Sequence, residues 1–232
     1  ESTTALKRAA DNFTSNVIRI INNLMSSSTA DNTLNVTLEN VNIKSSNKAA
    51  LSVEGEGDTT ITLEGKNTLT SGNQCAGLEH NGKDYYGSSD TGKLTITSKK
   101  DKAGKDTGSL TATGGGGSAG IGSGWYGTYY GAGTIEITGG DIKATGGNDA
   151  AGIGSCAKAT SDTHIIIHGT AKIEATATQN GAGIGSGDNS TGNTTIDIGG
   201  DAIVKAQGGS DGAGIGSGSV ATGYTNITIS GG

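Results

Sequence analysis

The hexapeptide AGIGSG constrains the fold of this chain more than any other feature of its sequence. Complete copies and one variant, AGIGSC, begin at Ala119, Ala182, Ala213 and, for the variant, Ala151. In chain order these alanines follow one another after 32, 31 and 31 residues. AALSVE at 49–54 and AGLEHN at 76–81 are degenerate copies. A period of this length indicates a solenoid of stacked structural units.

Two further segments recur in phase with the hexapeptide. The first includes VTLEN, ITLEG and TIEITGG, and the second includes NIK, DIKAT and KIEAT. Each period therefore holds three strands, as a coil of a parallel β-helix does. The 43 glycines have no three-residue period and the chain has no proline, which excludes collagen. We predict an all-β chain: a single-stranded, right-handed parallel β-helix of the pectin-lyase-like kind, with about six to seven coils.

Alternation within the strands predicts which side chains enter the core. In the first strand the inward column is Val36, Ile61, Leu94, Ile135, Ile165, Ile196 and Ile227. In the second strand it is Ile43, Leu69, Leu110, Ile142, Ile173 and Val204, beside a column of alanines. In the third, the Ala and Ile of the hexapeptide point inward and its glycines point outward. Lys143, Glu174 and Lys205 are expected to form a charge ladder on the outer surface.

The first 33 residues do not follow the repeat. Leu6, Ala9, Ala10, Phe13 and Val17 have helical spacing, which predicts a capping helix over about 3–14 and a first strand at 17–21. A single helix through Met25 fits this spacing nearly as well. We therefore expect one domain over 1–232, with a cap and first strand in about 1–33 and the coils in 34–232. The last coil is incomplete, which suggests truncation and an edge open to self-association, end to end or side by side.

The segments ITLEGKNTLTSG, LTITS, GSLTATGGGG, AGIGSG and TIEITGG together resemble a known kind of repeat. They are similar to glycine-rich repeats in large surface proteins of Gram-positive, often gut-dwelling, bacteria, some of which are labelled carbohydrate-binding-domain-like. The resemblance covers about 34–232 and carries no catalytic motif. It implies an extracellular setting at the bacterial cell surface.

Aromatic residues gather in one recurring turn, between the hexapeptide and the next strand. They are the candidate ligand-binding residues Tyr85, Tyr86, Trp125, Tyr126, Tyr129 and Tyr130, and Tyr224 returns to the same edge three coils later. Sugar rings stack on such side chains, and Tyr and Trp also anchor protein interfaces. The alternative is that the rings only pack over one another and pin two long loops. We hypothesise that Trp125 and at least one tyrosine are partly exposed.

A catalytic site is the competing interpretation, because many parallel β-helices process polysaccharides. Glu136 and Asp197 fall two coils apart in the outward column of the first strand, with His168 one coil from either. Two coils correspond to ~9–10 Å, close to the carboxyl separation in inverting glycosidases. Surface charges in water are the favoured explanation of these residues, and His164 is read as a surface residue too.

Other classes of function find little support in the sequence. A net charge of −6 without a basic run argues against nucleic acid, and no stretch is long and apolar enough to enter a membrane. GSGWYG at 122–127 lacks the helix that a dinucleotide site needs, and Asp149 and Asp211 lack the spacing of calcium-binding β-rolls. We expect no cofactor and no metal. Cys75 and Cys156 lie two coils apart and are expected to be free thiols.

The function predicted from the sequence is that of a non-catalytic extracellular module. It would mediate adhesion or carbohydrate binding through the aromatic turn, with a glycan or a host or cell-surface protein as partner. A pectin-lyase-like polysaccharide lyase or hydrolase is one alternative, and a purely structural surface stalk is another.

Overall fold

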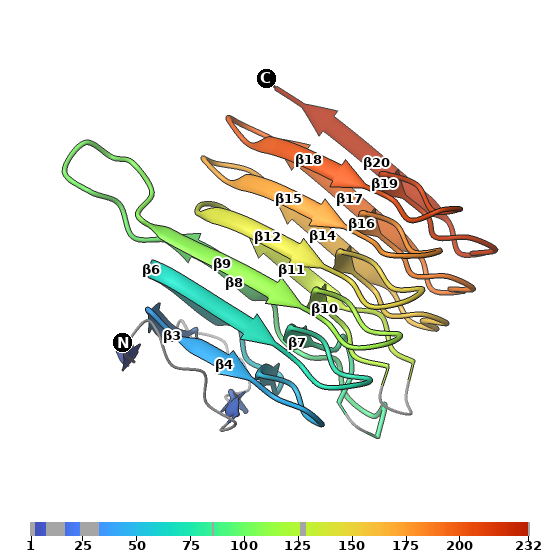
Figure 1. Ribbon diagram of the computed structural model, residues 1–232, viewed down its shortest axis with the longest axis horizontal. Helices are drawn as coiled ribbons and strands as arrows, with labels where there is room; N and C mark the ends of the chain where they lie inside the picture. The colour runs from blue at the N-terminus through green and yellow to red at the C-terminus, as the bar shows by residue number, and fades with distance from the viewer. Residues whose placement is uncertain (1–2, 8–16, 24–32, 85, 126–128, 232) are drawn as a thin grey trace.

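The computed structural model describes residues 3–7, 17–23, 33–84, 86–125 and 129–231, and for residues 3–7 the backbone alone. These residues form a β-solenoid of about six turns, with strands stacked in parallel along its length (Figure 1). The described part of the chain contains no helix. The architecture predicted from the repeats is confirmed at this level.

The strands form three faces. The first face holds β1 (Thr3–Lys7), β3 (Leu34–Glu39), the start of β6 (Thr59–Thr70), β8 (Leu94–Ser98), β11 (Gly133–Ile137), β14 (Thr163–Ile167), β17 (Thr194–Gly199) and β20 (Thr225–Ser230). The second face holds β4 (Asn42–Lys44), the end of β6, β9 (Gly108–Thr113), β12 (Asp141–Thr145), β15 (Lys172–Thr176) and β18 (Ile203–Gln207). The third face holds β2 (Ile18–Ile21), β5 (Leu51–Glu54), β7 (Leu78–His80), β10 (Ile121–Gly122), β13 (Ile153–Gly154), β16 (Ile184–Gly185) and β19 (Ile215–Gly216).

Columns of like apolar side chains form the core between the faces. Ile135, Ile165 and Ile196 occupy paired positions on the first face and are fully buried. Ile142 and Ile173 are likewise paired and buried on the second face. Ile227 lies in the last strand, β20, and is 42% exposed because no further strand pairs with it. Each coil thus depends on its neighbours to cover its apolar residues.

One detail of the predicted columns is wrong. Ile61 pairs with Ile96 rather than Leu94, and Leu69 pairs with Ala112 rather than Leu110. A shift of two residues leaves every side chain on its own face, so the alternation pattern cannot detect it. The buried Asn67 consequently lies opposite Leu110.

Asn67 keeps its polar atoms hydrogen-bonded inside the stack. Its Oδ1 accepts a hydrogen bond from Val41 N at 2.9 Å, and its Nδ2 donates to Ser109 O at 3.1 Å. A buried amide is tolerated there because both of its ends are paired.

The hexapeptides that begin at Ala119, Ala151 and Ala182 are buried on both sides, which corrects the expectation that their glycines face outward. Gly154 has φ +133°, and a Cβ at this position would lie 2.0 Å from Gly185 O in the next coil. The motif's serine is buried as well, and Ser155 Oγ accepts a hydrogen bond from Gly187 N at 3.0 Å. The glycines let neighbouring backbones approach, and the serine links one coil to the next.

The N-terminal prediction is partly wrong. Residues 3–7 form β1, which pairs in parallel with β3, so the predicted capping helix is absent there; residues 8–14 lie outside the described residues. The competing helix through Met25 is contradicted at Ile18–Ile21, which form β2 as the first of the two predictions expected. Residues 3–7 can form backbone hydrogen bonds with β3, whereas a short isolated helix is only marginally stable in water.

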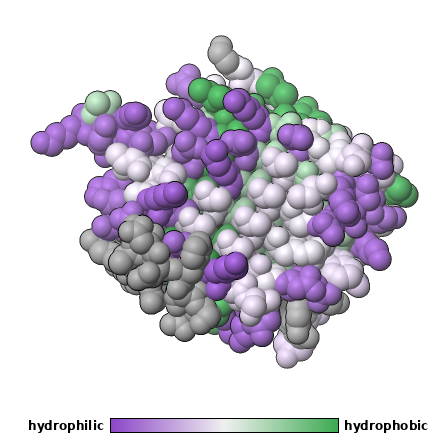
Figure 2. All heavy atoms as spheres, in the orientation of Figure 1, coloured by the Kyte–Doolittle hydropathy of each residue, from purple (hydrophilic) through white to green (hydrophobic). Residues whose placement is uncertain are grey.

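The outer surface follows the same repeat. Lys143 and Glu174 pair across β12 and β15, with 3.0 Å between Nζ and Oε2, and Lys205 follows in register, as predicted. Hydrophobic atoms gather towards the C-terminal end of the stack (Figure 2), where Ile203 and Ile229 are exposed. The loop between β8 and β9 projects at the left of the view in Figure 1, away from the turns that follow the strands of the third face.

Candidate functional site

The coil that holds β7 departs from the hexapeptide in three consecutive residues, as does the preceding coil, which holds β5. Pairing of β7 with β10 places Leu78 beside Ile121 and Glu79 beside Gly122. Glu79, His80 and Asn81 therefore stand where the regular motif has Gly, Ser and Gly. Each of the three makes side-chain contacts that the regular residues cannot make. Together they form the centre of the candidate site, and we call them the EHN triplet.

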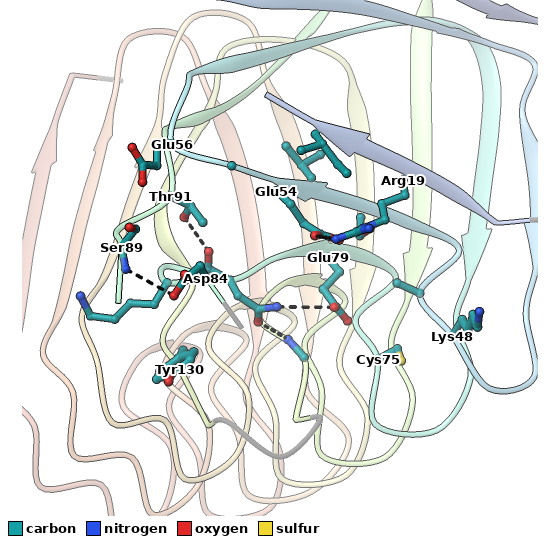
Figure 3. Close-up of a pocket in the computed structure, with 18 of the residues that line it drawn as sticks. Arg19, Lys48, Glu54, Glu56, Cys75, Glu79, Asp84, Ser89, Thr91 and Tyr130 are labelled. Atoms are coloured by element: carbon teal, nitrogen blue, oxygen red, sulfur yellow. Dashed lines mark hydrogen bonds and ion pairs between the residues drawn. The ribbon is translucent and has the colours of Figure 1, made fainter. Parts of the chain in front are cut away.

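The outer side of the triplet opens into a hollow with a volume of about 740 Å³. Strands β2, β5 and β7 and the loops that follow β7 and β10 line it. Figure 3 shows Glu54 and Arg19 above Glu79, with Asp84 and Tyr130 on other sides of the hollow. A hollow of this size is in the range of ligand-binding sites.

Glu79 is the acidic residue at the wall of this hollow. Its Oε2 accepts a hydrogen bond from Ala76 N at 2.9 Å, and Asn81 Nδ2 lies 3.5 Å from its Oε1. Burial raises the pKa of Glu79 to about 7, and the nearby Glu54 acts in the same direction. Glu79 therefore changes its charge near neutral pH.

Charged pairs surround Glu79. Arg19 Nε donates to Glu54 Oε1 at 2.7 Å, and this contact lowers the pKa of Glu54 below its ordinary value. On another side, Lys83 pairs with Asp90 across the base of the loop after β7. Arg19 and Lys83 are thus already paired with other carboxylates.

His80 points to the other side of β7 and is only 1% exposed. Its Nδ1 lies 2.7 Å from Ala132 O, and its Nε2 lies 2.9 Å from Gly92 O. Ala132 ends the loop that begins at Trp125, and Gly92 ends the loop that carries Tyr86. The ring thus contacts both aromatic loops at once.

Asn81 joins the same two loops. Its Oδ1 accepts a hydrogen bond from Gly124 N at 3.0 Å, and its backbone oxygen accepts one from Thr91 Oγ1 at 2.6 Å. In addition, Gly82 N donates to Gly131 O at 2.7 Å. The two loops therefore lie side by side, as their positions in the repeat predict.

The predicted aromatic residues divide into two groups. Tyr86 and Tyr130 line the hollow, and Tyr86 is 83% exposed. Tyr224 is also exposed but does not line the hollow. Tyr85 and Tyr126 lie outside the described residues.

Trp125 and Tyr129 mainly hold the loop in place. Their rings meet edge to face with centroids 5.7 Å apart, and the indole of Trp125 packs directly over Gly117. Trp125 is partly exposed, although its Nε1 is buried without a hydrogen-bond partner in the described structure. Ring packing therefore describes Trp125 and Tyr129, whereas Tyr86 and Tyr130 line the hollow.

The three weak catalytic candidates do not form one group. Glu136 lies within 2.6 Å of Lys93 Nζ and 2.8 Å of His168 Nε2, whereas Asp197 pairs with His164 at 2.8 Å. Although desolvation opposes it, hydrogen bonding to Lys93 and His168 keeps the pKa of Glu136 below its ordinary value. The hydrogen bond with His164 lowers the pKa of Asp197. A general acid needs a raised pKa, so this geometry does not favour either carboxyl in that role.

The two cysteines are free and buried. Burial raises the pKa of both Cys75 and Cys156 to about 12, so neither thiol is activated as a nucleophile. Among the described residues, no three His, Cys, Asp or Glu side chains are grouped to hold a metal ion. The same residues include no helix long and apolar enough to cross a membrane.

Comparison of the chain with protein-family models, with curated proteins and with solved structures found no match. The fold and the site define the chain as a parallel β-solenoid whose coil at β7 carries the EHN triplet in place of the regular residues.

Sequence reasoning found the aromatic residues but overlooked the triplet. AGLEHN is recognisable as a degenerate copy of the hexapeptide, and its three departures from the motif are the signal that marks the triplet. Replacement of Gly by Glu, Ser by His and Gly by Asn within a repeat is such a signal, because these side chains need new partners.

Proposed function

We propose that this chain is a non-catalytic, carbohydrate-binding module of an extracellular bacterial surface protein. The observation that carries the proposal is the exposed ring of Tyr86 beside a hollow lined by Tyr130 and several polar groups. An aromatic ring packs against the apolar face of a sugar, while carboxylates and amides accept or donate hydrogen bonds to its hydroxyl groups.

The surroundings of the hollow support binding to a preformed surface. Asn81 and His80 hold both loops against the stack through backbone contacts. Asp84 further stabilises its own loop, because its Oδ1 accepts a hydrogen bond from Ser88 N at 2.7 Å. A site held in this way loses less conformational entropy when it binds a ligand.

The cell-surface setting and the adhesive role belong to the same proposal, and they rest on the resemblance of the repeats. A right-handed sense of winding is also part of it, since parallel crossover connections are right-handed in nearly all proteins. The long regular stack would then present the modified coil on a rigid support.

Glycan binding can be tested with the single tryptophan and one tyrosine. We expect a glycan array to identify ligands whose addition shifts the emission of Trp125, which directly follows the lining residue Gly124 in the chain. Tyr86→Ala should weaken binding at least several-fold and leave the melting temperature nearly unchanged, because the ring is 83% exposed.

Tyr224→Ala is the matched control, since Tyr224 is similarly exposed but away from the hollow. Equal loss of binding in both variants would contradict a site at the hollow. If the hollow beside Tyr86 bound a surface protein and no glycan, the location of the site would stand but the ligand would be a protein.

A hydrolase is the second candidate function, and one observation favours placing it in the hollow. Glu79 and Glu54 both face this space, and their pKa values are shifted in opposite directions. Two carboxyls separated in this way can serve as acid and base. Release of reducing ends from an array ligand, abolished by Glu79→Gln, would establish this activity; ligand recovered intact would support the binding module.

A further inference from the structure

We propose that His80 is a positioning residue whose imidazolium form holds both aromatic loops against the solenoid, and that loss of one ring proton releases one loop. The claim about the loops stands on contacts within the chain. Its consequence for ligand binding rests on the proposed function.

The contacts of the ring determine how many protons it needs. Nδ1 and Nε2 each face a backbone carbonyl oxygen, at 2.7 and 2.9 Å. A carbonyl oxygen can only accept a hydrogen bond, so each nitrogen must carry a proton to make both bonds. Only the doubly protonated ring satisfies this arrangement.

The neutral ring has one proton and cannot hold both loops. Its bare nitrogen would place a lone pair against the lone pairs of a carbonyl group, which is repulsive at this separation. Either Gly92 or Ala132 must then move away or lose its partner. Because the ring is almost fully buried, water does not readily replace the missing donor.

The charges around His80 act on this equilibrium from several elements. Asp58, which precedes β6, attracts the protonated ring, and its own Oδ1 accepts a hydrogen bond from Lys93 N. Glu79 on β7 and Glu54 on β5 project towards the hollow, on the side of their strands away from the ring. The ring itself bonds only to backbone oxygens.

Burial lowers the pKa of His80, while the two carbonyl oxygens and Asp58 oppose this effect. The docked state offers the protonated ring two acceptors, and a state with one loop undocked offers only one. If the ring stays buried when one loop undocks, the docked state therefore binds the proton more tightly, so a fall in pH favours docking of both loops. A ring that reached water on undocking would regain a pKa of about 6.5, above that of the docked ring, and acid would then release the loop, an outcome that would overturn the proposal. We expect the transition on the acid side of the ordinary imidazole value of about 6.5.

The regular coils show what His80 adds. Ser123 occupies the equivalent position in the following coil, and its Oγ accepts one hydrogen bond from Cys156 N at 2.8 Å. That bond links one coil to the next and does not depend on pH in this range. Replacement of Ser by His exchanges one permanent link for two contacts that require a proton.

Imidazole ¹⁵N NMR of the whole chain provides the direct test. The chain has three histidines, and a His80→Ser variant, which restores the residue of the regular motif, identifies the signals of His80. Between about pH 4 and 8, we expect these signals to change from a doubly protonated to a neutral ring in one step. Trp125 emission and the amide signal of Gly92 or Gly131 should change with the same midpoint.

In His80→Ser the solenoid should still unfold cooperatively, but the coupled change in the loops should be lost. A ring that stays neutral throughout the pH range in which the protein is folded would overturn the proposal. So would a loop transition that persists unchanged in His80→Ser. The NMR titration of the unmodified chain decides the first point even if the variant does not fold.

None of these measurements includes a glycan, so a failure of glycan binding leaves them intact. A separate comparison of binding on the two sides of the measured midpoint tests the functional consequence. We expect tighter binding on the acid side in the unmodified chain and no such difference in His80→Ser. Equal affinities on both sides would remove the link to binding while the NMR result still decides the loop contacts.

Discussion

The coil with Ile153 and the coil with Leu78 occupy equivalent places in the solenoid, but their side chains make different contacts. In the first, glycines let the backbones of adjacent coils touch, and serines join them by hydrogen bonds. In the second, the EHN triplet replaces these residues, and its side chains reach the loops and the hollow. The difference shows that a regular repeat provides a support, whereas a local departure from the repeat provides a site.

The largest expected effect tests the regular coils. Ile196→Asp should lower the free energy of unfolding by about 3–5 kcal/mol and unfold the stack, because it places an unpaired carboxylate within a fully buried apolar column. Lys205→Asp in the adjacent charge ladder should cost less than about 1 kcal/mol. Chemical denaturation followed by circular dichroism measures both. Equal stabilities would refute the assignment of inward and outward positions.

A smaller effect tests the close contact between coils. Gly154→Ala should destabilise the protein by roughly 2–3 kcal/mol, because the added Cβ would lie 2.0 Å from Gly185 O and φ is +133°. Gly104→Ala separates these two causes, since Gly104 has φ +78° but nothing within 4 Å of the added Cβ. This control should cost only about 1 kcal/mol. Similar losses would show that backbone strain, rather than packing, requires glycine in the motif.

The smallest effect tests the modified coil through its pH dependence. The pKa of Glu79 is raised to about 7 in the folded chain, above the value of about 4.3 expected when the chain is unfolded. Between these values the folded chain holds a proton that the unfolded chain has lost. The stabilisation is therefore complete below about pH 4.3 and decreases as the pH rises to about 7.

Glu79→Gln should remove this dependence, whose size we expect to be on the order of 1 kcal/mol because the side chain is partly exposed. Denaturant titrations at about pH 4 and 8 give the free energy of unfolding at each pH, and the difference between the two values is the slope to be compared between variants. Glu174→Gln in a regular coil is the control, since that side chain is 55% exposed and should leave the wild-type slope in place. An unchanged slope in Glu79→Gln would show that Glu79 does not titrate in this window.

The repeat made the architecture predictable, because the columns of Ile and Ala follow directly from its period. The shift at Ile61 was not predictable, since a displacement by two residues preserves the alternation of sides. The strand at Thr3–Lys7 was missed for another reason: its pairing with β3 comes from a contact distant in sequence, whereas the helical prediction used local spacing.

The candidate site was predictable only in part. The gathering of Tyr86, Trp125 and Tyr130 in one turn is visible in the sequence, and the structure places their loops side by side. Which rings face the hollow depends on how each loop folds over its own glycines, such as Gly117. The contacts of His80 with two carbonyl groups could not be foreseen, because backbone oxygens leave no trace in the sequence.

β13 pairs with β16, and β16 with β19, in the same register, so distance along the molecule can be counted in coils. Each coil advances the stack by ~4.8 Å, the spacing of neighbouring strands. Duplication of the unit that runs from Ala151 to the residue before Ala182 would add one such step and preserve every glycine contact around it. The separation between the hollow and any later coil is therefore a whole number of similar steps, and adding or removing a repeat would change it by one step.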